Sequence, residues 1–364
     1  MKVTVFPSFG ALPENAVRLL EETERHSFYY GRSWLKNYCD HIPTSNDQIR
    51  FYVVTDVNSD DVLAVAPLVV TQNGAATRPK ALEGLSNYYS SLFGIPTKEM
   101  SSGSAAPFAA LFTTIAAERP RWSSINLRPL DNESTNYGAC ITALKNSGFI
   151  VQPYFCFGNW ILDVAGRSFD EYFQSLSSQV RNTVQRKEKQ LFKKPGVELR
   201  IVTEPADVDA AMDQYEVVYR SSWKEPEPYP GFMRGLVREA AKRSWLRLGI
   251  VTIEGQPAAA QIWINQSGVA SIYKLAYDEK FQQMSVGSVL TKALMRHAID
   301  VDKVNEVDYL TGDDAYKRDW MSRRRERWGL MAMNPRTWGG QLLIARYLGR
   351  ELLNRIRRSP RKPA

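Results

Sequence analysis

Three apolar segments joined by very short turns constrain the fold more than any other feature of the sequence. The segments cover residues 246–253, 257–265 and 269–277, and they are separated by Glu-Gly at 254–255 and Ser-Gly at 267–268. Apolar and β-branched residues favour strands, and glycine-containing pairs between such segments are typical of tight hairpin turns. The sequence therefore predicts an antiparallel three-stranded meander.

Helical and extended patterns alternate around this meander, in a similar order in the two halves of the chain. In the first half we expect strands at 50–56, 62–71, 124–127 and 149–164 and helices at 105–117 and 136–145. In the second half we expect helices at 206–222, 286–299 and 315–321 and further strands at 306–310 and 328–333. A helix that either Ser177 or Ser178 could cap lies between the halves.

This order predicts an α+β (mixed α/β) chain of two similar units in tandem, with mainly antiparallel sheets flanked by helices. The expected divisions are 1–165 for the first unit, 166–335 for the second unit, and 336–364 for a basic amphipathic tail.

The positive charge of the chain is concentrated in that tail. The 364 residues include 47 lysines and arginines and 39 aspartates and glutamates, for a formal net charge of +8. Seven of the arginines and one lysine lie in residues 335–364, where Glu351 is the one acidic residue. Nucleic-acid-binding proteins normally spread such charge over a face, so a nucleic-acid partner is not favoured.

Three further features of the sequence limit the class of protein, its location and its cofactors. No apolar run approaches the roughly 20 residues of a membrane-spanning helix, so a bundle of membrane helices is excluded. The N-terminal segment becomes polar too early for a secretory signal, which predicts a cytoplasmic protein. The three cysteines and three histidines lack metal-ligand spacing, so no metal is expected.

Residues 338–356 carry a basic amphipathic pattern. Its apolar positions are Leu342, Ala345, Leu348, Leu352 and Ile356, and its flanking basic positions are Arg346, Arg350, Arg357 and Arg358. Such a helix suits an anionic membrane surface and predicts peripheral contact with the inner face of the membrane. The alternative is a helix that docks its apolar face onto the domain and leaves its arginines in water.

Local sequences add a resemblance to a known family. Residues 308–320 read DYLTGDDAYKRDW, residues 84–90 read GLSNYYS, and an arginine-rich helix is expected at 181–189. With these features the chain resembles the acyl-CoA N-acyltransferase (GNAT) superfamily, in particular its FemAB-related, CelD-like group. The resemblance implies two tandem GNAT-like units and transfer of an acyl group from a thioester to an amine.

The segment QQMSVGS at 282–288 is the expected donor site. It places Ser285, Val286, Gly287 and Ser288 at a helix N-terminus, where unpaired N–H groups and the helix dipole favour a pyrophosphate. It has one glycine and a shifted spacing relative to the superfamily motif Gln/Arg-x-x-Gly-x-Gly/Ala, and the structural alternative is that Ser285 is a plain N-cap. The other donor-binding residues expected from the resemblance are Tyr273, Lys274, Ala276 and Lys317.

Ionisable side chains converge at 308–317, between a strand and the next helix. Such convergence beside a cleft tends to shift pKa values apart. The resemblance implies that Tyr316 protonates the leaving thiolate, and Asp313 or Asp278 is the expected base; the alternative is that Asp313 only caps a helix. The expected acceptor-binding residues are Asn87, Tyr89, Ser90, Arg181, Arg186 and Asp308.

The leading hypothesis is therefore an N-acyltransferase that uses acetyl-CoA or another acyl-CoA. Its acceptor would be a primary amine, on an amino sugar or on a cell-envelope or exopolysaccharide precursor; this acceptor class follows from the resemblance alone. One alternative is a FemAB-type peptidyltransferase with aminoacyl-tRNA as its donor. Another is a degenerate GNAT unit that binds without catalysis.

Overall fold

The computed structural model describes residues 1–42, 48–71, 80–98 and 105–358, with side chains as far as residue 350. The strands are β1 (Lys2–Phe6), β2 (Ile49–Thr55), β3 (Val62–Thr71), β4 (Ala81–Gly84), β5 (Ser124–Asp131), β6 (Ile150–Asp163), β7 (Val197–Val202), β8 (Leu246–Ile253), β9 (Gln256–Gln266), β10 (Val269–Tyr277), β11 (Glu306–Asp308) and β12 (Arg323–Met333). Within the described ranges they form a single sheet in the order β1-β2-β3-β4-β5-β12-β6-β11-β10-β9-β8-β7.

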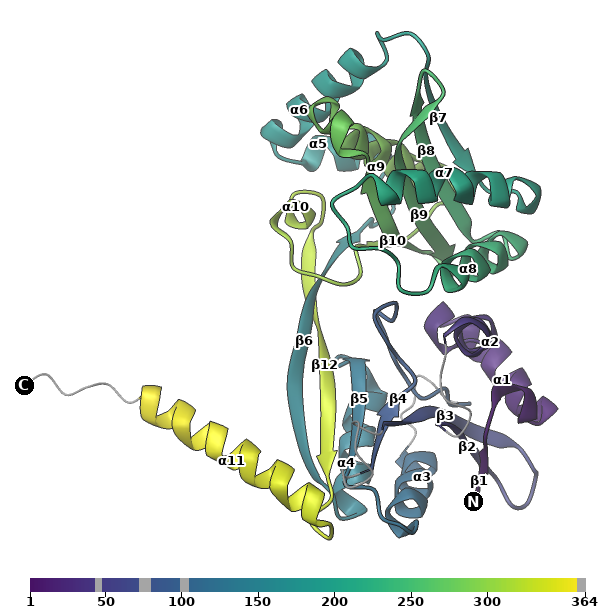
Figure 1. Cartoon of the computed structure of the whole chain (residues 1–364), viewed down its shortest axis with the longest axis vertical. Helices are drawn as coiled ribbons and strands as arrows, with labels where there is room; N and C mark the ends of the chain where they lie inside the picture. Colours follow the sequence, from purple (N-terminus) through teal and green to yellow (C-terminus); the bar gives the residue numbers. More distant parts are fainter. Residues whose placement is uncertain (43–47, 72–79, 99–104, 359–364) are drawn as a thin grey trace, which may run out of the picture.

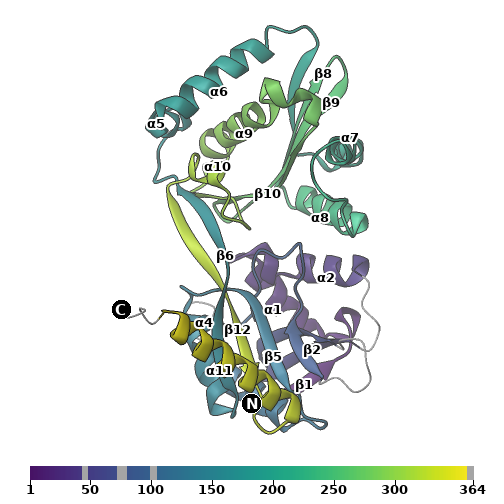
Figure 2. The same ribbon diagram turned by 60° about the vertical axis from the view of Figure 1, so that its left-hand side comes forward.

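Helices cover both faces of this sheet. They are α1 (Glu14–Glu24), α2 (Arg32–His41), α3 (Ala105–Ala117), α4 (Thr135–Asn146), α5 (Phe169–Ser175), α6 (Ser178–Leu191), α7 (Val208–Arg220), α8 (Pro230–Lys242), α9 (Val286–Arg296), α10 (Ala315–Arg318) and α11 (Trp338–Arg358). The structure has two lobes, of which the second contains strands β7 to β11. In this second lobe α7 and α8 lie on one face of the strands and α6 and α9 on the other (Figure 2). This arrangement confirms the expected mixed α/β class.

The two lobes are joined by strands that cross between them. β12 comes from the second half of the sequence, but it pairs with β5 on one side and with β6 on the other, so it completes the sheet of the first lobe. β6 also pairs with β11 of the second lobe. The long strands β6 and β12 therefore form a twisted ribbon between the lobes (Figure 1). A division of the chain at residue 165 stays a prediction.

The predicted meander is β8–β9–β10, with antiparallel pairing throughout. β10 pairs in parallel with β11, but only from Val269 to Ser271, opposite Glu306 to Asp308. β10 continues to Tyr277, so its second half does not pair with β11. The two strands therefore splay apart, which leaves an edge of β10 without a partner strand among the described residues.

An aromatic core locks the two lobes together. Trp34 of α2 packs edge to face on Phe232 of α8, with ring centroids 5.1 Å apart, and its centroid lies 6.3 Å from that of Tyr273 on β10. All three side chains are buried. Because large aromatic rings dominate core energetics, this contact sets how α1 and α2 of the first lobe sit against the second lobe.

The predicted tail helix is present as α11, and it begins soon after β12. Arg361 and Lys362 of the predicted tail lie outside the described residues. Among the helices that the structure describes, none combines the length and the apolar character needed to cross a bilayer.

A buried amide connects the meander to the start of α9. Gln261, 1% exposed, donates from Nε2 to the carbonyl of Gly287 and to Thr291 Oγ1, and its Oε1 accepts from Trp263 Nε1 at 2.9 Å. We expect Gln261→Leu to lower the free energy of unfolding by about 2 kcal/mol, because it leaves a buried indole N–H without an acceptor. Urea denaturation measures this. Gln190→Leu, at an exposed position of α6, is the control, and equal losses for both variants would contradict the assignment.

Candidate functional site

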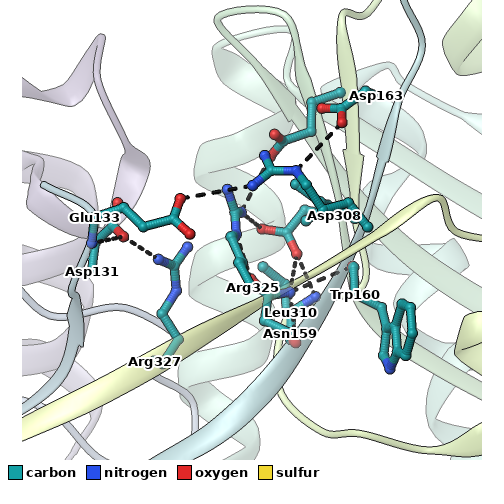
Figure 3. Close-up of polar contacts among 12 residues, drawn as sticks. Asp131, Glu133, Asn159, Trp160, Asp163, Asp308, Leu310, Arg325 and Arg327 are labelled. Atoms are coloured by element: carbon teal, nitrogen blue, oxygen red, sulfur yellow. Dashed lines mark hydrogen bonds and ion pairs between the residues drawn. The ribbon is translucent and has the colours of Figure 1, made fainter.

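A fully paired carboxylate ends the short strand β11. Asp308 Oδ1 accepts hydrogen bonds from Asn159 Nδ2 at 2.6 Å and from the Leu310 backbone N–H at 2.7 Å, and Oδ2 accepts from Arg325 Nη2 at 2.6 Å. Figure 3 shows these groups converging from β6, β11 and β12. The carboxylate is 7% exposed. Asp308, predicted as an acceptor contact, is therefore engaged in holding three strands together.

A cavity of about 310 Å³ lies beside this network, between the lobes. Its charged lining groups are already paired: Arg327 Nη1 is 2.8 Å from Asp131 Oδ1, and Arg325 Nη2 is 3.2 Å from Glu306 Oε1 as well as bonded to Asp308. Burial raises the pKa of Glu306. The cavity can admit a polar group, but its charged side chains already form ion pairs with one another.

The turn that follows β11 uses its own ionisable side chains for its shape. Lys317, 5% exposed, donates to the carbonyl of Thr311 and lies 3.2 Å from Asp314 Oδ2. Burial lowers the pKa of Lys317. The predicted role of Lys317 in holding a donor phosphate is not favoured, because its ammonium group is turned into this loop.

Asp313 is exposed and accepts a hydrogen bond at each of its carboxylate oxygens. Its two oxygens accept from Trp160 Nε1 at 2.7 Å and Arg324 Nε at 2.9 Å. The Arg324 contact, and then the Trp160 contact, hold the pKa of Asp313 below its usual value. A carboxylate stabilised in this way is a poor proton acceptor, so the structure argues against Asp313 as the base.

β10 carries a bulge where it leaves β11. The register against β9 shifts between Ile272 and Lys274, so Tyr273 is the extra residue. The Tyr273 side chain points into the core between the lobes, and its hydroxyl donates to the carbonyl of Tyr89 at 3.1 Å. Ala276 is also buried. For both residues the predicted donor contact is thus restricted to backbone groups.

Lys274, next along β10, forms an ion pair with a residue that sequence reasoning missed. Its Nζ lies 3.0 Å from Glu227 Oε1, and both side chains are more than nine-tenths buried. The ammonium group also sits 4.4 Å from the ring centroid of Tyr88 and 6.0 Å from that of Tyr219. The structure therefore brings β10, the 84–90 segment and the α7–α8 loop to one place.

The Glu227 carboxylate faces a cavity of about 310 Å³ between α7, α8 and the loop that joins them. Its Oε1 lies 3.0 Å from Lys274 Nζ, and the Tyr89 and Tyr219 hydroxyls also interact with the carboxylate. The buried Tyr215 hydroxyl, which lines the same cavity, has no hydrogen-bond partner among the described residues. Buried polar groups are normally paired, so this hydroxyl requires a separate explanation. The Tyr215 hydroxyl and the Glu227 carboxylate suit a ligand that donates hydrogen bonds.

Lys224, on the same loop, also lines this cavity. Burial, followed by repulsion from Lys274, lowers the pKa of Lys224 to about 8. Lys224 can therefore exchange a proton near neutral pH, unlike an ordinary lysine. The sequence signal was the run Lys224 to Glu227, which has two acids and a lysine within four residues; it was missed because charged loops are usually solvated.

The start of α9 lacks a side-chain cap. Ser285 has left-handed backbone angles, with φ 55°, and its side chain makes no capping hydrogen bond, so its reading as a plain N-cap is wrong. Val286 is fully buried, and a Cβ at Gly287 would lie 3.3 Å from Tyr277 Cδ1. The close approach that Gly287 permits is thus to this ring. An anion at the backbone of Ser285 to Ser288 stays a prediction.

Three other predicted site residues lie on α6 or directly after β10. Arg181 donates to the carbonyls of Gln174 and Leu176 and so stabilises the end of α5, and Asp278 caps the short helix 279–284. Both are structural, so their predicted roles as acceptor contact and base are not favoured. Arg186 is exposed on α6.

The 87–90 turn is also largely structural. Asn87 Oδ1 accepts from the Tyr89 N–H at 2.9 Å, Ser90 Oγ accepts from the Asn87 N–H at 3.1 Å, and the Tyr89 ring stacks on Phe232. Within this turn, the rings of both Tyr88 and Tyr89 lie near the Lys274 ammonium group, with centroids at 4.4 Å and 5.1 Å.

Tyr316 lies on the short helix α10. It is 46% exposed, and its ring lies edge-on to Tyr309 with centroids 5.8 Å apart. Burial, and then the nearby Asp314, raise the pKa of Tyr316 to about 12. Its role as the acid stays a prediction.

We expect Asp308→Ala to lower the free energy of unfolding by about 3 kcal/mol, because it leaves the buried Arg325 and Asn159 without their shared partner. Thermal denaturation followed by circular dichroism measures the loss. Asp170→Ala is the matched control, since its pair with Arg296 is exposed and such pairs contribute about 1 kcal/mol or less. If the two variants lose the same stability, the Asp308 network is not a structural centre.

Comparisons with known proteins agree with this geometry. The family described as acetyltransferase (GNAT) domain matches residues 178–318. Curated protein sequences gave no match. Among solved structures, FemX is similar with a TM-score of 0.60 and 10% identity, covering 91% of this chain and 97% of FemX.

Two other solved structures are similar at TM-scores of 0.53. One is the C-terminal domain of a candidate lysylphosphatidylglycerol synthetase from Agrobacterium fabrum, with 10% identity over 91% of this chain and 96% of that one. The other is a protein of unknown function from Bacteroides thetaiotaomicron, with 12% identity over 92% and 100%. At these identities the likeness shows the fold. Residues 178–318 therefore match a GNAT acetyltransferase domain, and the chain has the overall fold of FemX.

Proposed function

We propose that the chain transfers an acyl group from acetyl-CoA or another acyl-CoA to a primary amine, with the amine held by Glu227. The acceptor would be an amino sugar or another cell-envelope or exopolysaccharide precursor, met in the cytoplasm at the inner face of the membrane. The observation that carries the proposal is the buried Glu227 carboxylate, which lines the cavity between α7 and α8 and pairs with Lys274 on the splayed half of β10.

The splayed edge of β10 supports a thioester donor. Backbone N–H groups of β10 beyond Ser271 have no β11 partner, so one of them can donate to the thioester carbonyl oxygen. A fixed donor of this kind contributes about 3 kcal/mol when negative charge develops on that oxygen. The start of α9, which lacks a side-chain cap, follows β10 after one short helix, and its N–H groups are the proposed partners of the pyrophosphate of the same donor.

The proposed step balances without a covalent enzyme intermediate. The amine nitrogen attacks the thioester carbonyl carbon, the C–N bond forms, and the C–S bond breaks. Glu227 takes one proton from the nitrogen, and Lys224 gives one proton to the departing thiolate; solvent exchange then restores both groups. A lysine whose pKa is about 8 is a stronger acid than Tyr316, whose pKa is about 12, so Lys224 is the better candidate for this transfer.

An aminoacyl-tRNA donor is the second candidate. It is favoured by the segment 282–288, in which Gly287 is the one glycine and lies against the Tyr277 ring. Titration of the protein with acetyl-CoA separates the two donors, because micromolar binding supports the thioester. Without such binding, a steep loss of activity between low and moderate salt would support the RNA donor.

We expect Glu227→Gln to lower kcat for acetyl transfer to amino sugars by about 100-fold, because the amide cannot accept the amine proton. The affinity for acetyl-CoA should change little. Thiol release from acetyl-CoA, with a panel of amino sugars as acceptors, measures the rate. The control is Glu225→Gln, which removes an exposed carboxylate two residues away. An undiminished kcat for Glu227→Gln would remove Glu227 from the reaction.

We also expect kcat to fall as pH rises through about 8, because Lys224 loses the proton that it gives to the thiolate. Lys224→Met should lower kcat and abolish this limb of the profile. Lys242→Met, at a position 68% exposed, should leave the limb unchanged. A Lys224→Met enzyme with the same alkaline limb as the unaltered protein would show that another group titrates there.

A further inference from the structure

The helix α11 leaves the body of the protein with three large apolar side chains exposed. It starts at the far end of β12 and runs away from the sheet (Figure 1). Trp338 is 67% exposed, Leu342 39% and Leu348 59%. These three residues are spaced by four and six positions, which places them within one side of a helix of 3.6 residues per turn.

Two grooves lie between α11 and the sheet. One is lined by Leu343, Arg346, Tyr347 and Arg350 of the helix with Met331 and Met333 of β12, and the other by Trp338, Leu342, Leu343 and Arg346 with Ser124 and Asn126 of β5. Leu343 and Tyr347, which lie outside the apolar stripe of the sequence, are the less exposed of these helix residues. Docking of the helix by the stripe itself stays a prediction.

Positive charge borders the exposed stripe. Arg346 and Arg350 are both exposed, and they precede Arg355, Arg357 and Arg358 in the sequence of α11. Against these, Glu351 is the one acid of the helix. Exposed apolar side chains next to arginines on one helix are the pattern of helices that lie in the surface of an anionic membrane, with a tryptophan at the headgroup level.

We propose that α11 binds an anionic lipid bilayer, with Trp338, Leu342 and Leu348 inserted at the headgroup boundary and Arg346 and Arg350 against lipid phosphates. The charge decides between a bilayer and a second copy of the chain, because pairing two such helices would bring two sets of arginines together without acids to neutralise them. The proposal does not rest on the acyl-transfer reaction, since lipid binding is measured without donor or acceptor.

Sedimentation of the full chain with vesicles tests the proposal. We expect binding to vesicles of phosphatidylcholine with 30% phosphatidylglycerol, weak binding to phosphatidylcholine alone, and weaker binding as salt is added. Arg346→Gln with Arg350→Gln, and separately Leu342→Gln with Leu348→Gln, should each weaken binding about ten-fold or more. The matched control is Lys189→Gln with Lys193→Gln, which removes two exposed charges at the end of α6 and just beyond it and should change nothing.

Equal binding of both vesicle types, or equal binding by the α11 variants and the unaltered chain, overturns the proposal. Light scattering adds a second readout. A dimer that the Leu342→Gln, Leu348→Gln variant converts to a monomer, together with no vesicle binding, would assign the stripe to a second copy instead. Unchanged melting temperatures in all variants show that the comparison is between folded proteins.

Discussion

The Asp308 carboxylate is the interaction on which the rest of the structure depends. It is buried and bonded to Asn159, Arg325 and the Leu310 backbone, so it ties β6, β11 and β12 together where the ribbon between the lobes meets the second lobe. Because these bonds turn the chain away after Asp308, β11 stops pairing with β10, which continues alone to Tyr277. The same carboxylate therefore holds the lobes together and creates the free strand edge that the proposed donor needs.

The two buried carboxylates Asp308 and Glu227 have different surroundings. Asp308 is held within the sheet by donors on both oxygens, whereas Glu227 pairs with Lys274 and lines the cavity between α7 and α8. The buried Tyr215 hydroxyl of the same cavity has no hydrogen-bond partner among the described residues, and buried polar groups are normally paired. A ligand in this cavity would supply that partner and meet the Glu227 carboxylate, which is why we place the amine there.

Local pattern predicted much of the fold and little of the site. The meander, the β2–β3 hairpin, α3 and α9 follow from apolar periodicity and turns, which are local properties. α1, α2, α8 and the edge strand β7 were missed, and β12 was placed with the second unit although it pairs with β5. Asp313, Lys317 and Arg181 have suitable functional groups, but these groups already form hydrogen bonds, with Arg324, Thr311 and Gln174 respectively. Glu227 could not be found, because its burial depends on residues far away in sequence.

The central claim is that an acyl donor lies along the splayed half of β10 and at the start of α9. Amide hydrogen exchange with and without saturating acetyl-CoA tests it most directly, because each backbone N–H that bonds the donor exchanges more slowly. The account predicts slower exchange within 272–277 and 285–289, while β2 and β3 of the first lobe are unchanged. Binding of acetyl-CoA with no added protection in either segment would contradict it.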